Sequence, residues 1–124
     1  MASPYALVVE DDPQVAGLFR IALQDAGYQT EVLDNGHKAQ VSLMFTAPDL
    51  ILLDLHLPAL DGGVLLRQIR SQSRLAHTRV MLVTGDEAGA QRFADQVDST
   101  LYKPVGYDQV HQVARQLMPL FASS

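Results

Sequence analysis

The chain alternates short apolar runs with longer segments whose apolar residues recur at helical spacing. The apolar runs have the length of β-strands and occupy 5–9 (YALVV), 28–33 (YQTEVL), 49–53 (DLILL), 79–83 (RVMLV) and 99–102 (STLY). The segments between them predict helices over 13–26, 37–46, 63–72, 87–96 and 107–121. DLILL and RVMLV lack polar alternation at their centres, which is typical of parallel strands covered on both faces. Five β/α repeats of this kind predict a doubly wound α/β sandwich.

The first and last predicted helices carry signals for where they begin and end. Asp12 is a favourable N-cap, Pro13 suits the first turn, and Gly27 follows the apolar stripe as a C-terminal stop. The last segment keeps its apolar spacing up to Phe121. Pro119 is a position at which that helix can end early or kink.

Length and composition bound the kind of protein. With 124 residues and 48% hydrophobic content, the chain has the size of one domain with one main site. Its 14 acidic and 9 basic side chains give a net charge of −5 without a basic stripe, so direct nucleic-acid binding is not expected. The absence of cysteine excludes disulfides and thiolate metal sites. No apolar run reaches about 18 residues and no signal-type start is seen, so we expect no membrane insertion and a cytoplasmic location.

Polar side chains with reactive groups follow four of the predicted strands. Glu10 and Asp11 end the first strand, and the later ends carry Asp54, Thr84 and Lys103. The carboxyl ends of parallel strands share one sheet edge, and ligands bind there where the winding reverses, between strands 1 and 3 of a sheet ordered 2-1-3-4-5. That order brings Asp54 beside Glu10 and Asp11. Three carboxylates without thiolate or histidine spacing favour a hard oxygen site for Mg²⁺ or Mn²⁺ rather than zinc.

Four motifs, in this order and spacing, make the chain similar to a known family. They are VVEDD at 8–12, LLDLHLPALDG at 52–62, LVTG at 82–85 and YKP at 102–104. With them, the chain from about Tyr5 to Phe121 resembles the receiver domain of two-component response regulators. The resemblance implies a flavodoxin-like (βα)5 sandwich with parallel sheet order 2-1-3-4-5. It also implies a single receiver domain over 1–124 with its core at about 5–121.

The resemblance implies roles for the residues at the strand ends. Asp54 is the implied phosphoacceptor, which takes a phosphoryl group from a sensor histidine kinase or a histidine phosphotransfer protein. Thr84 is implied to bond a phosphoryl oxygen, and Lys103 to pair with the phosphoryl group. Phosphoryl transfer needs mainly positioning and neutralised charge, which a metal ion and a lysine can supply.

The resemblance also implies how a metal is held. Asp11, Asp54 and the backbone carbonyl of His56 are the implied direct ligands of Mg²⁺ (or Mn²⁺), and Glu10 is implied to act through water. His56 and Asp86, each two residues after a site residue, stand where side chains of this family overlook the phosphoryl site and tune the access of water.

In this family the domain is a signalling module rather than an enzyme, with catalysis confined to its own phosphorylation and dephosphorylation. The implied output surface is formed by the segments 87–96, 99–102 and 107–121, which bind a downstream protein. Dimerisation on phosphorylation is a further implied outcome.

One position departs from the family pattern. Thr100 stands where many receivers carry an aromatic residue that turns inward on activation, and Tyr102 lies next to the lysine instead. Glycine weakens helices, so Gly85 and Gly89 loosen the segment after Thr84. We therefore expect the backbone after Thr84 to carry the conformational change.

The residues alone leave other interpretations open. Glu10, Asp11 and Asp12 can form a solvated strand end with a helix cap. A Mg²⁺-dependent phosphohydrolase of the haloacid-dehalogenase type also uses an aspartate at a strand end, but its second aspartate falls where this chain has His56. A nucleotide-binding domain needs a Gly-rich turn after the first strand, which this chain lacks. A receiver kept only as a docking surface does not need an intact set of acceptor, hydroxyl and lysine.

Overall fold

The computed structural model describes residues 3–120 and contains one five-stranded sheet in which all paired strands are parallel. The strands are β1 (Tyr5–Val9), β2 (Gln29–Leu33), β3 (Leu50–Leu53), β4 (Arg79–Thr84) and β5 (Ser99–Tyr102). Their order is β2-β1-β3-β4-β5, which confirms the expected arrangement.

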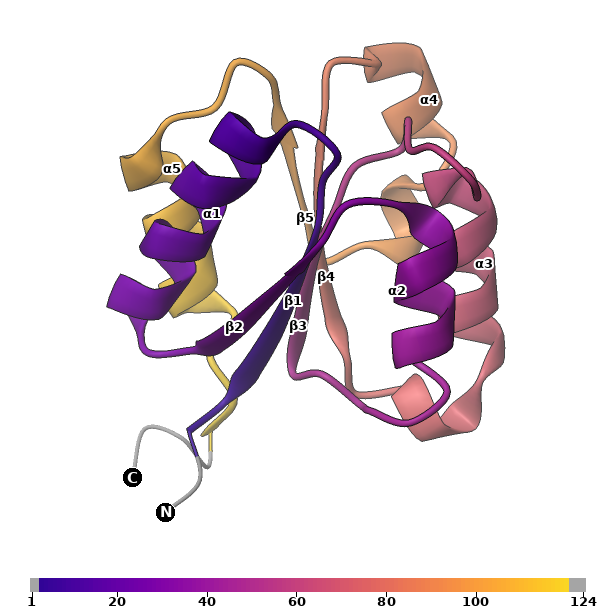
Figure 1. Cartoon of the computed structure of the whole chain (residues 1–124), viewed down its shortest axis with the longest axis horizontal. Helices are drawn as coiled ribbons and strands as arrows, with labels where there is room; N and C mark the ends of the chain where they lie inside the picture. The colour runs from indigo at the N-terminus through magenta and orange to yellow at the C-terminus, as the bar shows by residue number, and fades with distance from the viewer. Residues whose placement is uncertain (1–2, 121–124) are drawn as a thin grey trace.

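Helices cover both faces of this sheet. They are α1 (Pro13–Ala26), α2 (Gly36–Ser42), α3 (Gly62–Ser71), α4 (Glu87–Gln91) and α5 (Tyr107–Gln116), with short 3-10 turns η1 (Ser73–Leu75) and η2 (Ala94–Gln96). Figure 1 shows α1 and α5 together on one face and α2, α3 and α4 on the other. Alternate strand residues enter two apolar clusters, with Leu7 on the α3 side and Val8 on the α1 side. The predicted doubly wound sandwich is confirmed, and none of the helices described is long and apolar enough to cross a membrane.

Both ends of α1 form as predicted. Asp12 Oδ1 accepts the amides of Gln14 at 2.9 Å and Val15 at 3.3 Å. Gly27 has a φ of +113°, in the left-handed region, and its amide donates to the Gln24 carbonyl at 3.0 Å. An aspartate N-cap and a left-handed glycine satisfy backbone groups that the helix itself leaves unpaired.

The helix predicted over 37–46 is shorter than expected. It ends at Ser42, and the chain turns at Leu43. The Arg74 guanidinium donates to the carbonyls of Leu43 and Thr46, so these groups are satisfied without another helical turn. Phe45, inside the predicted helix, is 80% exposed.

The helices predicted over 87–96 and 107–121 also end early. The first is α-helical only over Glu87–Gln91, because Phe93 adopts a φ of −113° and buries its ring against Gly63, and the segment closes with the 3-10 turn η2. The second ends at Gln116, since Pro119 disfavours helical geometry in the residue before it. Phe121, part of the predicted apolar stripe, lies outside the described residues.

Candidate functional site

Three carboxylates meet at the carboxyl ends of β1 and β3. Val9 pairs with Leu53 across these strands, so the residues that follow, Glu10 and Asp54, lie at the same level of the sheet. Carboxylate oxygens of Glu10, Asp11 and Asp54 all lie within 4.8 Å of one another. Glu10 and Asp54 are buried, with 1% and 6% exposure, whereas Asp11 is exposed. The predicted cluster therefore forms, with one side open to solvent.

The ammonium group of Lys103 reaches this cluster from the end of β5, just before a cis Lys103–Pro104 bond. Its Nζ donates to Glu10 Oε1 at 2.6 Å and to Asp54 Oδ2 at 2.9 Å. Burial raises the pKa of the Glu10 carboxyl against the opposing effect of Lys103. Burial also opposes the charge on Lys103, but its hydrogen bonds to Glu10 and Asp54 outweigh burial and raise its pKa. Lys103 thus stays cationic and offsets only part of the negative charge.

The cluster fits a hard divalent cation. All three acidic side chains offer carboxylate oxygens, the donors that Mg²⁺ and Mn²⁺ prefer. One ammonium group among three carboxylates leaves an excess of negative charge that a divalent ion would neutralise. The exposed Asp11 lets an ion arrive from solvent without opening the core.

Thr84 and His56 complete the edge of the sheet around Asp54. Thr84 ends β4, next to β3, and is fully buried; its Oγ1 accepts the amide of Asp86 at 3.2 Å. The amide of His56 donates to Asp54 Oδ1 at 3.2 Å. Both oxygens of Asp54 are therefore engaged, one by the His56 amide and the other by Lys103. The role of the His56 carbonyl as a metal ligand stays a prediction.

The resemblance placed His56 and Asp86 over the same site, but a direct bond between them was not predicted. His56 Nε2 donates to Asp86 Oδ2 at 2.8 Å. The other oxygen, Asp86 Oδ1, accepts the amide of Gly89 at 2.8 Å and caps α4. The pKa of Asp86 is lowered, most strongly by the hydrogen bond from the Gly89 amide and next by the hydrogen bond from the His56 ring. An aspartate directly before a predicted helix is a signal for the cap, but no local pattern indicates the bond to His56.

The loop that carries Asp54 is closed by a tight backbone approach. The Gly62 amide donates to the Leu55 carbonyl at 2.8 Å. A Cβ at Gly62 would lie 2.0 Å from the carbonyl oxygen of Asp54, so any larger residue would push the loop away. This approach fixes the backbone on which Asp54 stands.

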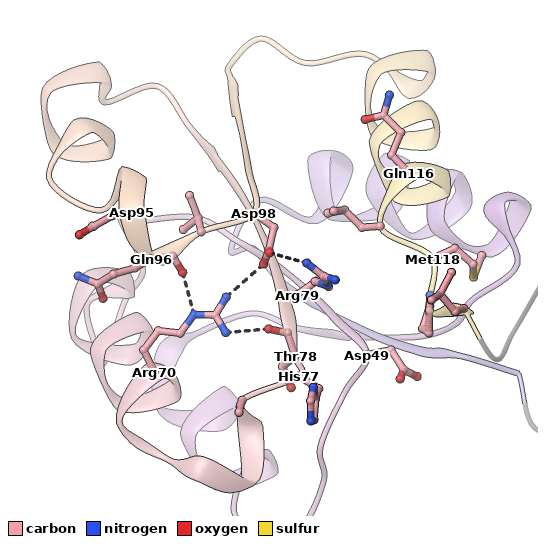
Figure 2. A pocket seen from close by; sticks show the side chains of 15 residues that line it. Asp49, Arg70, His77, Thr78, Arg79, Asp95, Gln96, Asp98, Gln116 and Met118 are labelled. Atoms are coloured by element: carbon pink, nitrogen blue, oxygen red, sulfur yellow. Dashed lines mark hydrogen bonds and ion pairs between the residues drawn. The ribbon is translucent and has the colours of Figure 1, made fainter.

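A wide recess lies at the opposite end of the strands and has a volume of about 1150 Å³. Figure 2 shows the Arg70 guanidinium bonded to the carboxylate of Asp98 and to the carbonyls of Gln96 and Thr78, at 2.7 to 3.2 Å. Arg79 also pairs with Asp98, at 3.1 Å. Because these groups satisfy one another's hydrogen bonds and charges, we interpret the recess as a structural junction. The candidate reactive groups lie at the other end of the sheet, with Glu10, Asp11 and Asp54.

Comparison with known proteins places most of the chain in one family. The response regulator receiver domain matches residues 6–115. The DNA-binding dual master transcriptional regulator RpaA of Synechocystis is 32% identical over 118 residues, which cover 93% of this chain and 49% of that protein. This chain therefore spans about half the length of that curated relative.

Solved structures share the fold over nearly the whole chain. The receiver domain of the Francisella response regulator 1452 is 26% identical with a TM-score of 0.81, covering 92% of this chain and 95% of that one. The response regulator protein TrrA of Thermotoga maritima, solved in complex with Mg²⁺-BeF, has a TM-score of 0.81 at 23% identity, covering 93% of this chain and 99% of that one. At that identity the second likeness concerns the fold alone.

Proposed function

The chain belongs to the receiver domain family of two-component response regulators, and we propose that Asp54 is its phosphoacceptor. The observation that carries this proposal is the surroundings of Asp54. Its carboxylate is buried, within 4.8 Å of two further carboxylates, and paired with Lys103 at 2.9 Å. Such a site can neutralise a phosphoryl group as well as receive one.

In the proposed transfer, an Asp54 carboxylate oxygen attacks the phosphorus of a phosphohistidine on the donor protein. A P–O bond of an acyl phosphate forms while the P–N bond breaks, and the donor imidazole leaves with the electron pair and takes up a proton from solvent. Lys103 remains beside the acceptor to offset charge on the phosphoryl oxygens, and the Thr84 hydroxyl donates to one of them. The protein thus contributes position and charge and needs no further general acid or base.

For the metal, Asp11, Asp54 and the His56 carbonyl would hold Mg²⁺ (or Mn²⁺) directly, and Glu10 would act through water. When bound, the ion supplies positive charge that screens the carboxylates from the incoming phosphoryl oxygens. The presence of Mg²⁺-BeF in the structure of TrrA, which shares this fold, supports the proposal.

The proposed donor is a sensor histidine kinase or a histidine phosphotransfer protein, and the proposed output is a protein that binds the surface of α4, β5 and α5. Tyr102, 42% exposed at the end of β5, belongs to that surface. RpaA, whose name describes it as DNA-binding, is about twice as long as this chain. Because this chain has a net charge of −5, we assign no DNA contact to this domain. Dimerisation on phosphorylation is a further proposed outcome.

A phosphohydrolase of the haloacid-dehalogenase type is disfavoured at the same site. Its second aspartate would stand at His56, whose ring instead binds Asp86.

Incubation with acetyl phosphate tests the proposed function. The phosphoacceptor should gain the mass of one phosphoryl group when Mg²⁺ is present, whereas turnover of many equivalents without any mass gain would support the hydrolase.

A further inference from the structure

Two chains of contacts lead from the acceptor site to α4, and they meet at Asp86. In the first, the His56 amide binds Asp54 Oδ1 at 3.2 Å and the His56 ring binds Asp86 Oδ2 at 2.8 Å. In the second, Thr84 Oγ1 accepts the Asp86 amide at 3.2 Å. The remaining oxygen of Asp86 caps α4 through the Gly89 amide at 2.8 Å. One side chain therefore joins the loop after β3, the end of β4 and the first turn of α4.

Few other contacts hold α4. The helix has five residues, and Ala90 is the one that is buried. Gly89 lies at its centre and lowers its intrinsic stability. In a helix this short, the N-cap is a large share of what keeps the first turn formed. Figure 1 shows α4 at the same end of the sheet as the loop between β3 and α3.

We propose that the Asp86 carboxylate couples the acceptor site to α4, with one oxygen held by His56 and the other capping the helix. This inference rests on the proposed function, because it names the route by which a change at Asp54 reaches the output surface. Asp86 acts here as a positioning residue and does not touch the phosphoryl group.

In the proposed coupling, phosphorylation acts on this route at both of its starting points. On Asp54 Oδ1, the phosphoryl group turns the acceptor of the His56 amide into the ester oxygen of an acyl phosphate, which is a weaker acceptor. On either oxygen, the phosphoryl group offers a new partner to the Thr84 hydroxyl, whose oxygen now accepts the Asp86 amide. Movement of His56 pulls on Asp86, and movement of Thr84 pulls on the same residue through its amide. Thr100 carries no ring that could transmit the change along β5.

The coupling can be tested first without any ligand. His56→Ala removes the imidazole but leaves the capping oxygen of Asp86 in place. We expect the amides of Gly89 and Ala90 to exchange hydrogen about two- to tenfold faster than in wild type, the range for losing one hydrogen bond that supports the cap. His77→Ala, which removes an exposed imidazole elsewhere, is the matched control and should leave these rates unchanged. Equal rates in both variants would overturn the proposed coupling.

A second test uses beryllofluoride with Mg²⁺ as a phosphoryl mimic. A Cβ at position 89 would lie 2.4 Å from Asp86 Oδ2, the oxygen that binds His56, so Gly89→Ala should displace this oxygen while favouring helix. In amide NMR spectra of saturated protein, His56→Ala and Gly89→Ala should each lose at least half of the shift change over residues 87–91. In Gly89→Ala the amides of Leu55 and Thr84 should keep theirs, and His77→Ala should respond as wild type does.

The outcomes separate this inference from the proposed function. Wild type that shows no response to beryllofluoride and Mg²⁺ would contradict the acceptor site itself, and the exchange rates of unliganded protein would still decide whether Asp86 couples the loop to α4. Full wild-type shifts over 87–91 in both His56→Ala and Gly89→Ala would leave the acceptor site intact and refute the role of Asp86.

Discussion

Lys103 Nζ lies 2.9 Å from Asp54 Oδ2, although 49 positions separate the two residues in the chain. The same ammonium, which comes from the end of β5, also binds the buried Glu10 at 2.6 Å. One cation thus compensates two carboxylates that have little access to water.

Lys103→Met should destabilise the metal-free protein. It leaves Glu10 and Asp54 buried without a counterion, and we expect a loss of roughly 1–3 kcal/mol in the free energy of unfolding, reduced from the cost of a fully buried pair because Lys103 is partly exposed. Urea unfolding in EDTA measures this change in the free energy of unfolding. Lys38→Met is the control, because the Lys38–Asp34 pair is exposed on both sides and its loss should hardly change the free energy of unfolding. Equal losses in the two variants would contradict the compensating role of Lys103.

Mg²⁺ should raise the melting temperature, because it binds the folded acidic cluster and not the unfolded chain. At a hundredfold excess over Kd, such binding contributes about 2.7 kcal/mol. Asp11→Asn should remove most of this rise, and in EDTA it should melt above wild type because one of three repelling charges is gone. Differential scanning calorimetry with and without Mg²⁺ measures both effects. A variant with the full Mg²⁺ response would show that Asp11 is not a ligand.

Two glycine substitutions should change stability in opposite directions. Gly17 lies within α1, and a Cβ built there would have no atom within 4 Å apart from its chain neighbours and the nearby backbone of its own helix, so Gly17→Ala should stabilise by about 1 kcal/mol. Gly62→Ala should destabilise by roughly 2 kcal/mol or more, because its Cβ would meet the Asp54 carbonyl oxygen at 2.0 Å. Gly62→Ala should also slow labelling of Asp54. Comparable stability of the two variants would rule out the tight approach at Gly62.

Stability should fall at alkaline pH through Tyr28. Its hydroxyl donates to the Ala114 carbonyl at 2.7 Å, and burial raises the pKa of Tyr28 from 10.0 to about 12. The unfolded chain therefore releases this proton first, so the contribution is complete below pH 10 and is lost as the pH rises towards about 12. At pH 11 about 1 kcal/mol should be gone.

Tyr28→Phe separates this contribution from other alkaline effects. It should cost about 1 kcal/mol at neutral pH through the lost hydrogen bond. The difference from wild type should then shrink between pH 9 and pH 11 in urea unfolding, whereas Tyr5, whose pKa is also raised to about 12, contributes equally to both proteins. A difference that stays constant over this range would contradict the assignment to Tyr28.

The sequence predicted the parts of the fold that depend on local pattern. Apolar runs located every strand to within one residue, and Asp12 and Gly27 marked both ends of α1. The ends of α2 and α4 were wrong because distant residues decide them. Arg74 takes up the carbonyls after α2, and Phe93 leaves the helix to pack on Gly63.

The candidate site was predictable to a similar extent. Parallel strands bring their carboxyl ends together, which was enough to group Glu10, Asp11 and Asp54 and to expect Lys103 at the same edge. The bond between His56 and Asp86 joins two loops 30 positions apart, and no periodicity or spacing specifies it. Such contacts depend on how loops meet and become visible only in the folded chain.

The most direct measurement of the central proposal is the intact mass of the protein after incubation with acetyl phosphate, with Mg²⁺ or with EDTA. Wild type should gain one phosphoryl group only with Mg²⁺, Asp54→Ala should gain none, and Asp108→Ala, which removes an exposed aspartate on α5, should behave as wild type. An unchanged mass gain in Asp54→Ala would contradict the assignment of Asp54 as the phosphoacceptor.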